Sequence, residues 1–180
     1  TADGTAWVVN SEAVAPVGGP AGAVKRYDLN LTELAGAGWT GSWAQREEPG
    51  LLFYRTGIDT TPDGSVLVNT EASDRFQRFD SAGASTGSVL LDLPGPVYRN
   101  PYSVAVDKVD GSMYVPLINF RDTPAVTPFL EKRNAANEVV AQFTSTALPA
   151  GQVVFSAEVE PQTQDVFAWS QNGSIVQWDK

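Results

Sequence analysis

Residues 58–83 read IDTTPDGSVLVNTEASDRFQRFDSAG, and the pattern of this stretch decides the fold. It contains a short apolar strand, the turn Pro62-Asp63-Gly64, a second apolar strand, a short polar loop and a third strand that ends at Asp80. An Asp-Gly pair supplies the positive φ that a tight hairpin turn needs. The flanking apolar runs are therefore predicted to pair as antiparallel strands.

The third strand of this stretch has three copies elsewhere in the chain. The segments VKRYD, FQRFD, LEKRN and IVQWD all end in Asp or Asn, at Asp28, Asp80, Asn134 and Asp179. These residues recur every 45 to 54 positions, which is close to the ~40–50 residues of one propeller blade. The Asp-Gly turn also recurs, at Asp3-Gly4 and Asp110-Gly111, whereas the fourth copy lacks it.

The repeat predicts an all-β fold, a β-propeller built of about four blade-like, four-stranded repeats. The repeats cover residues 1–50, 51–97, 98–148 and 149–180 of a single domain. The first strands of three repeats end at Asp59, Asp107 and Glu160, which we treat as equivalent positions. The first repeat begins at its Asp-Gly turn and the last ends after its third strand, so we expect a segment of a larger propeller.

Tyr27, Phe79 and Trp178 precede the Asp that ends three of the third strands. Their recurrence at one register predicts that these aromatic rings pack between blades.

Composition excludes several kinds of site. The chain has no Cys and no His, which excludes thiol and imidazole nucleophile systems and zinc sites built on those ligands. Its net charge of −9 argues against nucleic-acid binding. No apolar run approaches the ~20 residues of a membrane helix. Few lysines and much Ala, Gly, Ser and Thr resemble an exported bacterial protein, so we expect an extracellular or periplasmic location.

Residues 58–83 resemble the NHL-repeat propellers and their six-bladed relatives. The resemblance lies in the strand, Pro-Asp-Gly turn, strand and Arg-Phe-Asp pattern, and weaker copies extend it over nearly the whole chain. It implies a propeller fold, and it implies no particular activity because propellers serve many functions.

Two loops between second and third strands are long, at residues 11–23 and 118–127. The strand order places both on the face opposite the Asp-Gly turns, where we expect binding; neutral insertion is the alternative. The predicted binding residues on this loop face are Asn10, Asn69, Glu71, Asn100, Asn119, Phe120, Arg121 and Asp122. Phe120, Arg121 and Asp122 combine an aromatic ring, a forked donor and an acceptor, which suits an interface anchor.

Two functions follow from these residues. The first is an exported, non-catalytic propeller module without a cofactor, which presents the loop face to a protein or glycan or packs in a larger assembly, with other copies or the rest of a larger propeller. The alternative follows from a weak resemblance to gluconolactonase-like six-bladed hydrolases. It implies that Asn69, Glu71 and Asn100 hold Ca²⁺, which would polarise a lactone carbonyl and activate water. A third interpretation is structural, with Asn at a strand end satisfying the backbone nearby.

Overall fold

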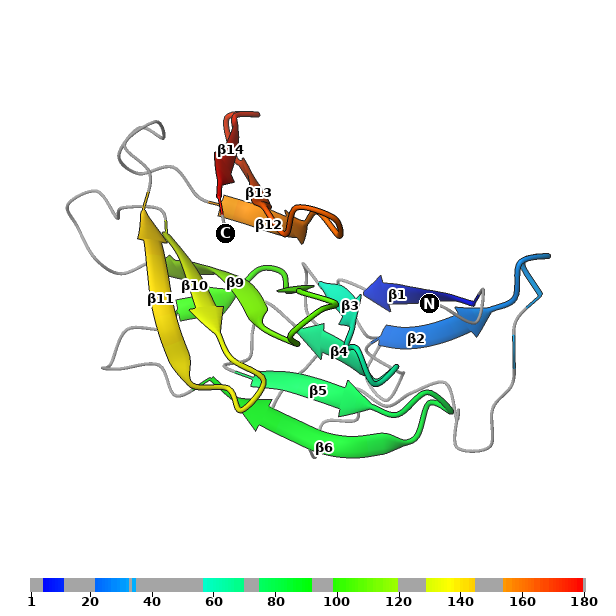
Figure 1. Cartoon of the computed structure of the whole chain (residues 1–180). Coiled ribbons are helices and arrows are strands. Elements are labelled where there is room, and N and C mark those ends of the chain that lie inside the picture. The colour runs from blue at the N-terminus through cyan, green and yellow to red at the C-terminus, as the bar shows by residue number, and fades with distance from the viewer. Residues whose placement is uncertain are drawn as a thin grey trace, which may run out of the picture.

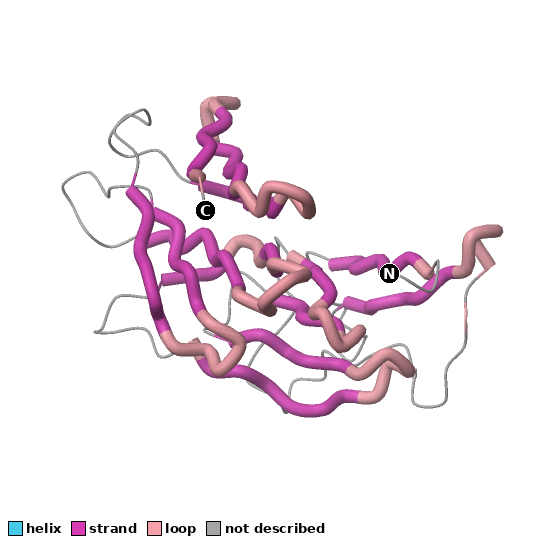
Figure 2. The backbone as a smooth tube through the Cα atoms, in the orientation of Figure 1, coloured by secondary structure: helices cyan, strands magenta, loops and turns pink. Residues whose placement is uncertain are grey.

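The computed structural model describes residues 5–11, 22–32, 34, 57–69, 75–91, 99–119, 129–144 and 154–179. In these residues the chain forms fourteen β-strands in four antiparallel sheets, and no helix (Figures 1 and 2). The prediction of an all-β fold is confirmed. Within the same ranges, nothing helical is long and apolar enough to cross a membrane.

Each sheet corresponds to one predicted repeat. Sheet 1 contains β1 (Ala6–Ser11) and β2 (Gly22–Tyr27). Sheet 2 contains β3 (Ile58–Thr60), β4 (Val66–Asn69), β5 (Arg75–Phe79) and β6 (Ser85–Leu90), paired in chain order. Sheet 3 contains β7 (Arg99–Pro101), β8 (Ala105–Val106), β9 (Met113–Asn119), β10 (Phe129–Arg133) and β11 (Val139–Thr144). Sheet 4 contains β12 (Val154–Val159), β13 (Val166–Ser170) and β14 (Ile175–Trp178).

Sheet 3 differs from the predicted four strands because its first strand is split. β7 and β8 both pair with β9. The Tyr102 amide still bonds the Pro116 carbonyl oxygen at 3.2 Å, and residues 103 and 104 leave the ladder. Pro101 and Pro116 lie at this point. Neither has the amide N–H that a continuous ladder uses, which accounts for the interruption.

The Asp-Gly turns form as predicted wherever the structure describes them. Gly64 has φ of 80° and Gly111 has φ of 75°. Oδ1 of Asp63 accepts a hydrogen bond from the Ser65 amide at 3.0 Å, and Oδ1 of Asp110 accepts one from Ser112 at 2.8 Å. Asp3-Gly4 lies outside the described residues. In sheet 4 Gln164, with φ of 64°, occupies the left-handed position without glycine.

The recurring Asp or Asn after the third strand caps the next turn. Oδ1 of Asp80 accepts from the amides of Ala82 and Ala84. Asp28 and Asn134 accept from the amides two and four residues ahead in the same way. A short side-chain acceptor at this position therefore fixes the hairpin between third and fourth strands, which is why the residue type repeats.

The sheets stack face to face, with their first strands side by side. β3 lies against β8, and β12 lies against β8 and β9. β1 lies beside β3 (Figure 1). Sheets 2 and 3 bury one apolar cluster, made of Leu67, Phe76, Leu91, Val104, Val106, Met113, Val115 and Leu117. Sheets 3 and 4 bury a second, made of Ala105, Tyr114, Leu130, Val154, Ala157, Val159, Val166 and Ala168. This is the arrangement expected of successive propeller blades.

Alternation along the strands gives each sheet two distinct faces. Phe76 and Leu130, four residues before the capping Asp or Asn, point to the following sheet, and we call this the forward face. Trp178, one residue before it, packs against the core shared with the preceding sheet, and we call this the rear face. Inter-blade packing is therefore confirmed for Trp178, and Phe79 is buried at the same register.

Asp59 is not equivalent to Asp107 and Glu160, contrary to the sequence-based alignment. The backbone amides of Thr61, Asp107 and Glu160 close the first hairpin turns by bonding Ser65, Ser112 and Asp165. The register then makes Asp59 equivalent to Glu158, because each lies opposite the forward-facing residue of the second strand, Leu67 or Phe167. The alignment, made on acidic residues at the strand ends, was wrong by two residues, and the longer first turns of sheets 3 and 4 account for one of them.

Candidate functional site

The structure describes only part of the predicted loop-face site. Glu71, Phe120, Arg121 and Asp122 lie outside the described residues. Asn10, Asn100 and Asn119 lie in β1, β7 and β9, where the backbone alone is described. Asn119 pairs with Arg99 and Ile118 pairs with Asn100, so Asn100 and Asn119 lie on adjacent strands at one end of sheet 3. None of these positions tests the binding role of the loop face, which stays a prediction.

Asn10 and Asn69 both come at the end of a second strand, but they do not share a register. Asn69 lies opposite Phe76, whereas Asn10 lies opposite Ala23, one residue beyond the equivalent pair Val9 and Val24. A shift of one residue changes the face of a strand, so the two asparagines are not equivalent positions.

Asn69 itself is fully buried between sheets 2 and 3. Its Nδ2 donates a hydrogen bond to the Pro101 carbonyl oxygen at 2.8 Å. Its backbone amide bonds the carbonyl of Gly57 at 3.0 Å. A Cβ atom on Gly57 would lie 2.4 Å from Asn69 Oδ1 and 2.6 Å from Ser103 Cα. Asn69 therefore links one sheet to the next, and the glycine makes room for it.

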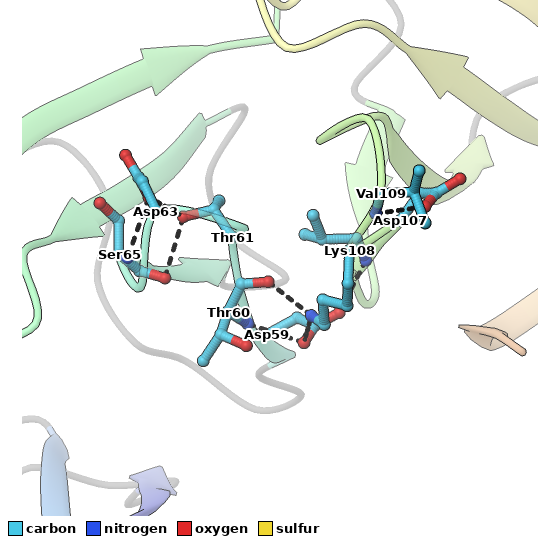
Figure 3. A network of polar contacts seen from close by, with 9 residues as sticks. Asp59, Thr60, Thr61, Asp63, Ser65, Asp107, Lys108 and Val109 are labelled. Carbon is cyan, nitrogen blue, oxygen red and sulfur yellow. Dashed lines mark hydrogen bonds and ion pairs between the residues drawn. The ribbon is translucent and has the colours of Figure 1, made fainter. Parts of the chain in front are cut away.

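A group of charged side chains, missed by the sequence reasoning, joins the first strands of sheets 2 and 3 (Figure 3). Oδ2 of Asp59 accepts from the Val106 amide at 2.6 Å, and Oδ1 accepts from the Thr60 amide at 2.7 Å. Lys108 Nζ forms an ion pair with Asp59 Oδ1 and also donates to the Thr60 carbonyl oxygen at 2.5 Å. We call Asp59, Lys108 and Glu158 the axial charge group.

Glu158 belongs to this group through its electrostatics. Desolvation raises the pKa of the Glu158 carboxyl, and the negative charge of Asp59 raises it further. Lys108 acts in the opposite direction. The three side chains therefore share one electrostatic environment where first strands from sheets 2, 3 and 4 meet. The part of the chain with described side chains contains no group of three acidic residues placed to hold a metal ion.

A cavity of about 450 Å³ lies between sheets 2 and 3, on the side of the Asp-Gly turns. Its walls include Leu67, Val89, Met113, Arg78 and Asn137. Arg78 Nη2 is held by Asp63 Oδ2 at 2.7 Å, so the one cation of the wall is already paired. The cavity lies on the face opposite the predicted one.

On the rear face of sheet 3, the ion pair of Glu131 and Arg133 stands where the repeat predicts an aromatic ring. Arg133 takes the position of Phe79 and Trp178, and both Glu131 and Arg133 are 1% exposed. Arg133 Nε donates to Glu131 Oε2 at 2.8 Å, and Nη1 donates to Asn137 O at 3.1 Å and Oδ1 at 3.2 Å. Gln142 Nε2 donates to Glu131 Oε1 at 3.2 Å. The other three repeats have an aromatic residue at this register, so the sequence pattern did not predict a buried ion pair.

Comparisons with known proteins bear on the fold. No protein-family model and no curated protein sequence matches the chain. A solved protein of unknown function from Bacteroides caccae matches with a TM-score of 0.51 at 14% identity, over 88% of this chain and 56% of its own. The fold is that of a β-propeller. At this identity the likeness concerns the fold alone.

Two lyase structures are similar at lower scores. A virginiamycin B lyase from Staphylococcus aureus gives a TM-score of 0.49 at 10% identity, over 87% of this chain and 48% of its own. A streptogramin B lyase gives 0.49 at 9% identity, over 98% of this chain and 59% of its own. The chain thus spans roughly half of the length of the solved propellers it matches, in keeping with the predicted segment of a larger propeller.

Proposed function

We propose that this chain is an exported, non-catalytic propeller module that presents the loop face to a protein or glycan partner or packs in a larger assembly. The observation that carries the proposal is the position of Asn69. It is the member of the predicted calcium site whose side chain the structure describes, and its Nδ2 atom bonds the next sheet. Nδ2 of Asn69 therefore contributes to packing between the sheets.

The geometry around Asn69 leaves no room for a calcium ion on the Gly57 side of Oδ1. A carbonyl oxygen such as that of Pro101 only accepts hydrogen bonds, so Nδ2 must face it and Oδ1 must face Gly57. Calcium lies at about 2.3–2.6 Å from its oxygen ligands. The point 2.4 Å from Oδ1 where a Gly57 Cβ would stand is only 2.6 Å from Ser103 Cα, so backbone occupies the space a cation would need there.

The loop-face role is supported by topology. The 11–23 loop joins β1 to β2, and the 118–127 loop joins β9 to β10, so both leave their sheets at the end where Asn69 closes β4. Repeat proteins gather binding loops on one face in this way. Export is supported by composition alone.

A calcium titration separates this proposal from the hydrolase alternative. We expect Ca²⁺ to release no binding heat and to leave the melting temperature unchanged. Asn69→Ala should lower the free energy of unfolding by about 1–3 kcal/mol, with or without Ca²⁺, because it leaves the buried Pro101 carbonyl without its donor. Asn30→Ala, at an exposed turn position, is the matched control. Calcium-dependent stabilisation that Asn69→Ala abolishes would instead favour the hydrolase.

Binding by the loop face has its own test. The double change Phe120→Ala with Arg121→Ala should weaken binding to an immobilised glycan or protein ligand by ~2 kcal/mol or more. The melting temperature should stay nearly unchanged, because a contact residue contributes little to folding. Unchanged affinity, or a collapse of the melting temperature, would assign these residues to structure.

A further inference from the structure

The last sheet of the series has an open apolar face. Ile175 is 69% exposed and Trp169 is 46% exposed, and the two lie opposite one another on β14 and β13. By register, Ile175 is equivalent to Phe76 in sheet 2 and Leu130 in sheet 3, which are each 0% exposed. A position that is buried at two successive junctions is therefore open on the forward face of sheet 4.

The neighbouring positions follow the same rule. Trp169 is equivalent to Asn69 and Pro116, which are both buried. Phe155 of β12 packs against Trp169 with ring centroids 5.4 Å apart and against Tyr102 at 5.3 Å, so its ring links Trp169 to sheet 3. Glu158, also on this face, is equivalent to Asp59, whose carboxylate accepts the Val106 amide of the following sheet. The forward face of sheet 4 thus has a carboxylate where sheet 2 uses one to bond sheet 3, and an aromatic ring in place of Asn69.

The first sheet is open on its opposite, rear face. Ala6 is exposed, whereas its register equivalents Val66, Met113 and Val166 are buried in sheets 2, 3 and 4. Tyr27 on the same face is equivalent to Trp178, which packs against the core shared with the preceding sheet, and to the buried Phe79. Sheet 1 therefore has an open rear face, and sheet 4 has an open forward face.

We propose that the forward face of sheet 4 docks the rear face of sheet 1 in a second copy of this chain. The occupant follows from the repeat, because the junctions inside the chain join a forward face to a rear face. Two copies would contribute eight sheets, within the range of about four to eight blades of known propellers. A head-to-tail contact of this kind closes into a ring when the rotation allows it. The inference rests on the second part of the proposed function, packing in a larger assembly, and names the two sheet faces and the partner.

Light scattering and sedimentation of the whole chain test the proposal. We expect a concentration-dependent species of twice the 19.2 kDa chain mass. Ile175→Lys should weaken its formation at least about tenfold, since it places a charge at the centre of the contact. Val109→Lys is the matched control, because Val109 is 64% exposed but lies in a turn away from both faces. Circular dichroism should show all variants folded, because each replaced side chain is exposed.

A mixing experiment distinguishes the partner face. Ala6→Arg should weaken self-association as Ile175→Lys does, yet the two variants mixed should form a heterodimer through their one intact pair of faces. A chain that stays monomeric at every concentration would overturn the proposal. So would a dimer that Ile175→Lys disrupts and Ala6→Arg leaves intact, because the contact would then join two forward faces. Neither result would alter the calcium and loop tests of the proposed function.

Discussion

The buried pair Glu131 and Arg133 offers the sharpest test of how these sheets pack. In sheet 2 the register equivalents are Gln77 and Phe79, and the left-handed turn residue is Gly83 rather than Asn137. Sheet 3 therefore replaces an amide, an aromatic ring and a glycine with an ion pair and an asparagine that accepts from Arg133.

Breaking the pair on one side should be costly. Arg133→Met leaves the Glu131 carboxylate buried with one remaining donor, Gln142, at 3.2 Å. Removing one partner of a buried ion pair typically costs about 3–5 kcal/mol, whereas replacing the whole pair with well-packed neutral residues is often neutral or stabilising. We therefore expect Arg133→Met to lose about 3–5 kcal/mol. The triple change Glu131→Gln, Arg133→Phe, Asn137→Gly, which copies sheet 2, should recover most of that loss.

The assay is urea unfolding followed by tryptophan fluorescence, with the free energy of unfolding taken from the linear extrapolation. Arg78→Met is the matched control, because Arg78 pairs with Asp63 at the surface. Its loss should be under about 1 kcal/mol. If Arg133→Met cost no more than Arg78→Met, or if the triple variant were less stable than Arg133→Met, the argument that buried charge must be removed as a unit would be refuted.

Three further changes test single features of the fold by the same unfolding assay or by NMR. Gln164→Gly should raise the free energy of unfolding by ~1 kcal/mol, because Gln164 has φ of 64°, and Gln164→Ala should not. Gly57→Ala should lower it by about 1–3 kcal/mol, since the new Cβ would stand 2.4 Å from Asn69 Oδ1 and 2.6 Å from Ser103 Cα; wild-type stability would show that the sheets can separate there. Bonds from Thr61 and Ser65, with the Arg78 charge, lower the pKa of Asp63 to about 2. Its folded pKa is thus below the unfolded value, so its contribution is present above about pH 4 and is lost as pH falls toward about 2; solvent screening keeps it under about 1 kcal/mol, and Asp63→Asn should remove it.

Local chemistry was predictable from the sequence. The turns at Asp63-Gly64 and Asp110-Gly111 formed as expected, because few residues other than glycine adopt their backbone conformation. The strands β6 and β11 supply the last strand of the predicted four-stranded repeat in sheets 2 and 3. Each of these features depends on a few residues that are neighbours in the sequence, so the sequence pattern is sufficient to predict it.

Register between repeats was less predictable. The first hairpin closes from residue 61 to 65 in sheet 2 and from residue 107 to 112 in sheet 3, so a gap-free comparison misplaces Asp59. Asn69 was a reasonable ligand candidate by residue type, yet only its neighbours show that it bonds Pro101. Lys108 carried no signal at all, because its partner Asp59 lies 49 residues away. Contacts between sheets are set by three-dimensional stacking, which residue type alone does not encode.

The exposure of Ile175 does not by itself identify the forward face of sheet 4 as a contact surface. The register of Ile175 with buried residues of other sheets does so. Leu29 and Leu31 are more exposed than Ile175, but they lie in the turn after Asp28, where isolated apolar residues are ordinary. Ile175 instead belongs to a series whose other described members, Phe76 and Leu130, are fully buried. Burying an isoleucine side chain stabilises by roughly 1.5–3 kcal/mol. A folded chain that leaves this position open therefore gains from any partner that continues the stack, and the rear face of sheet 1 has the matching register.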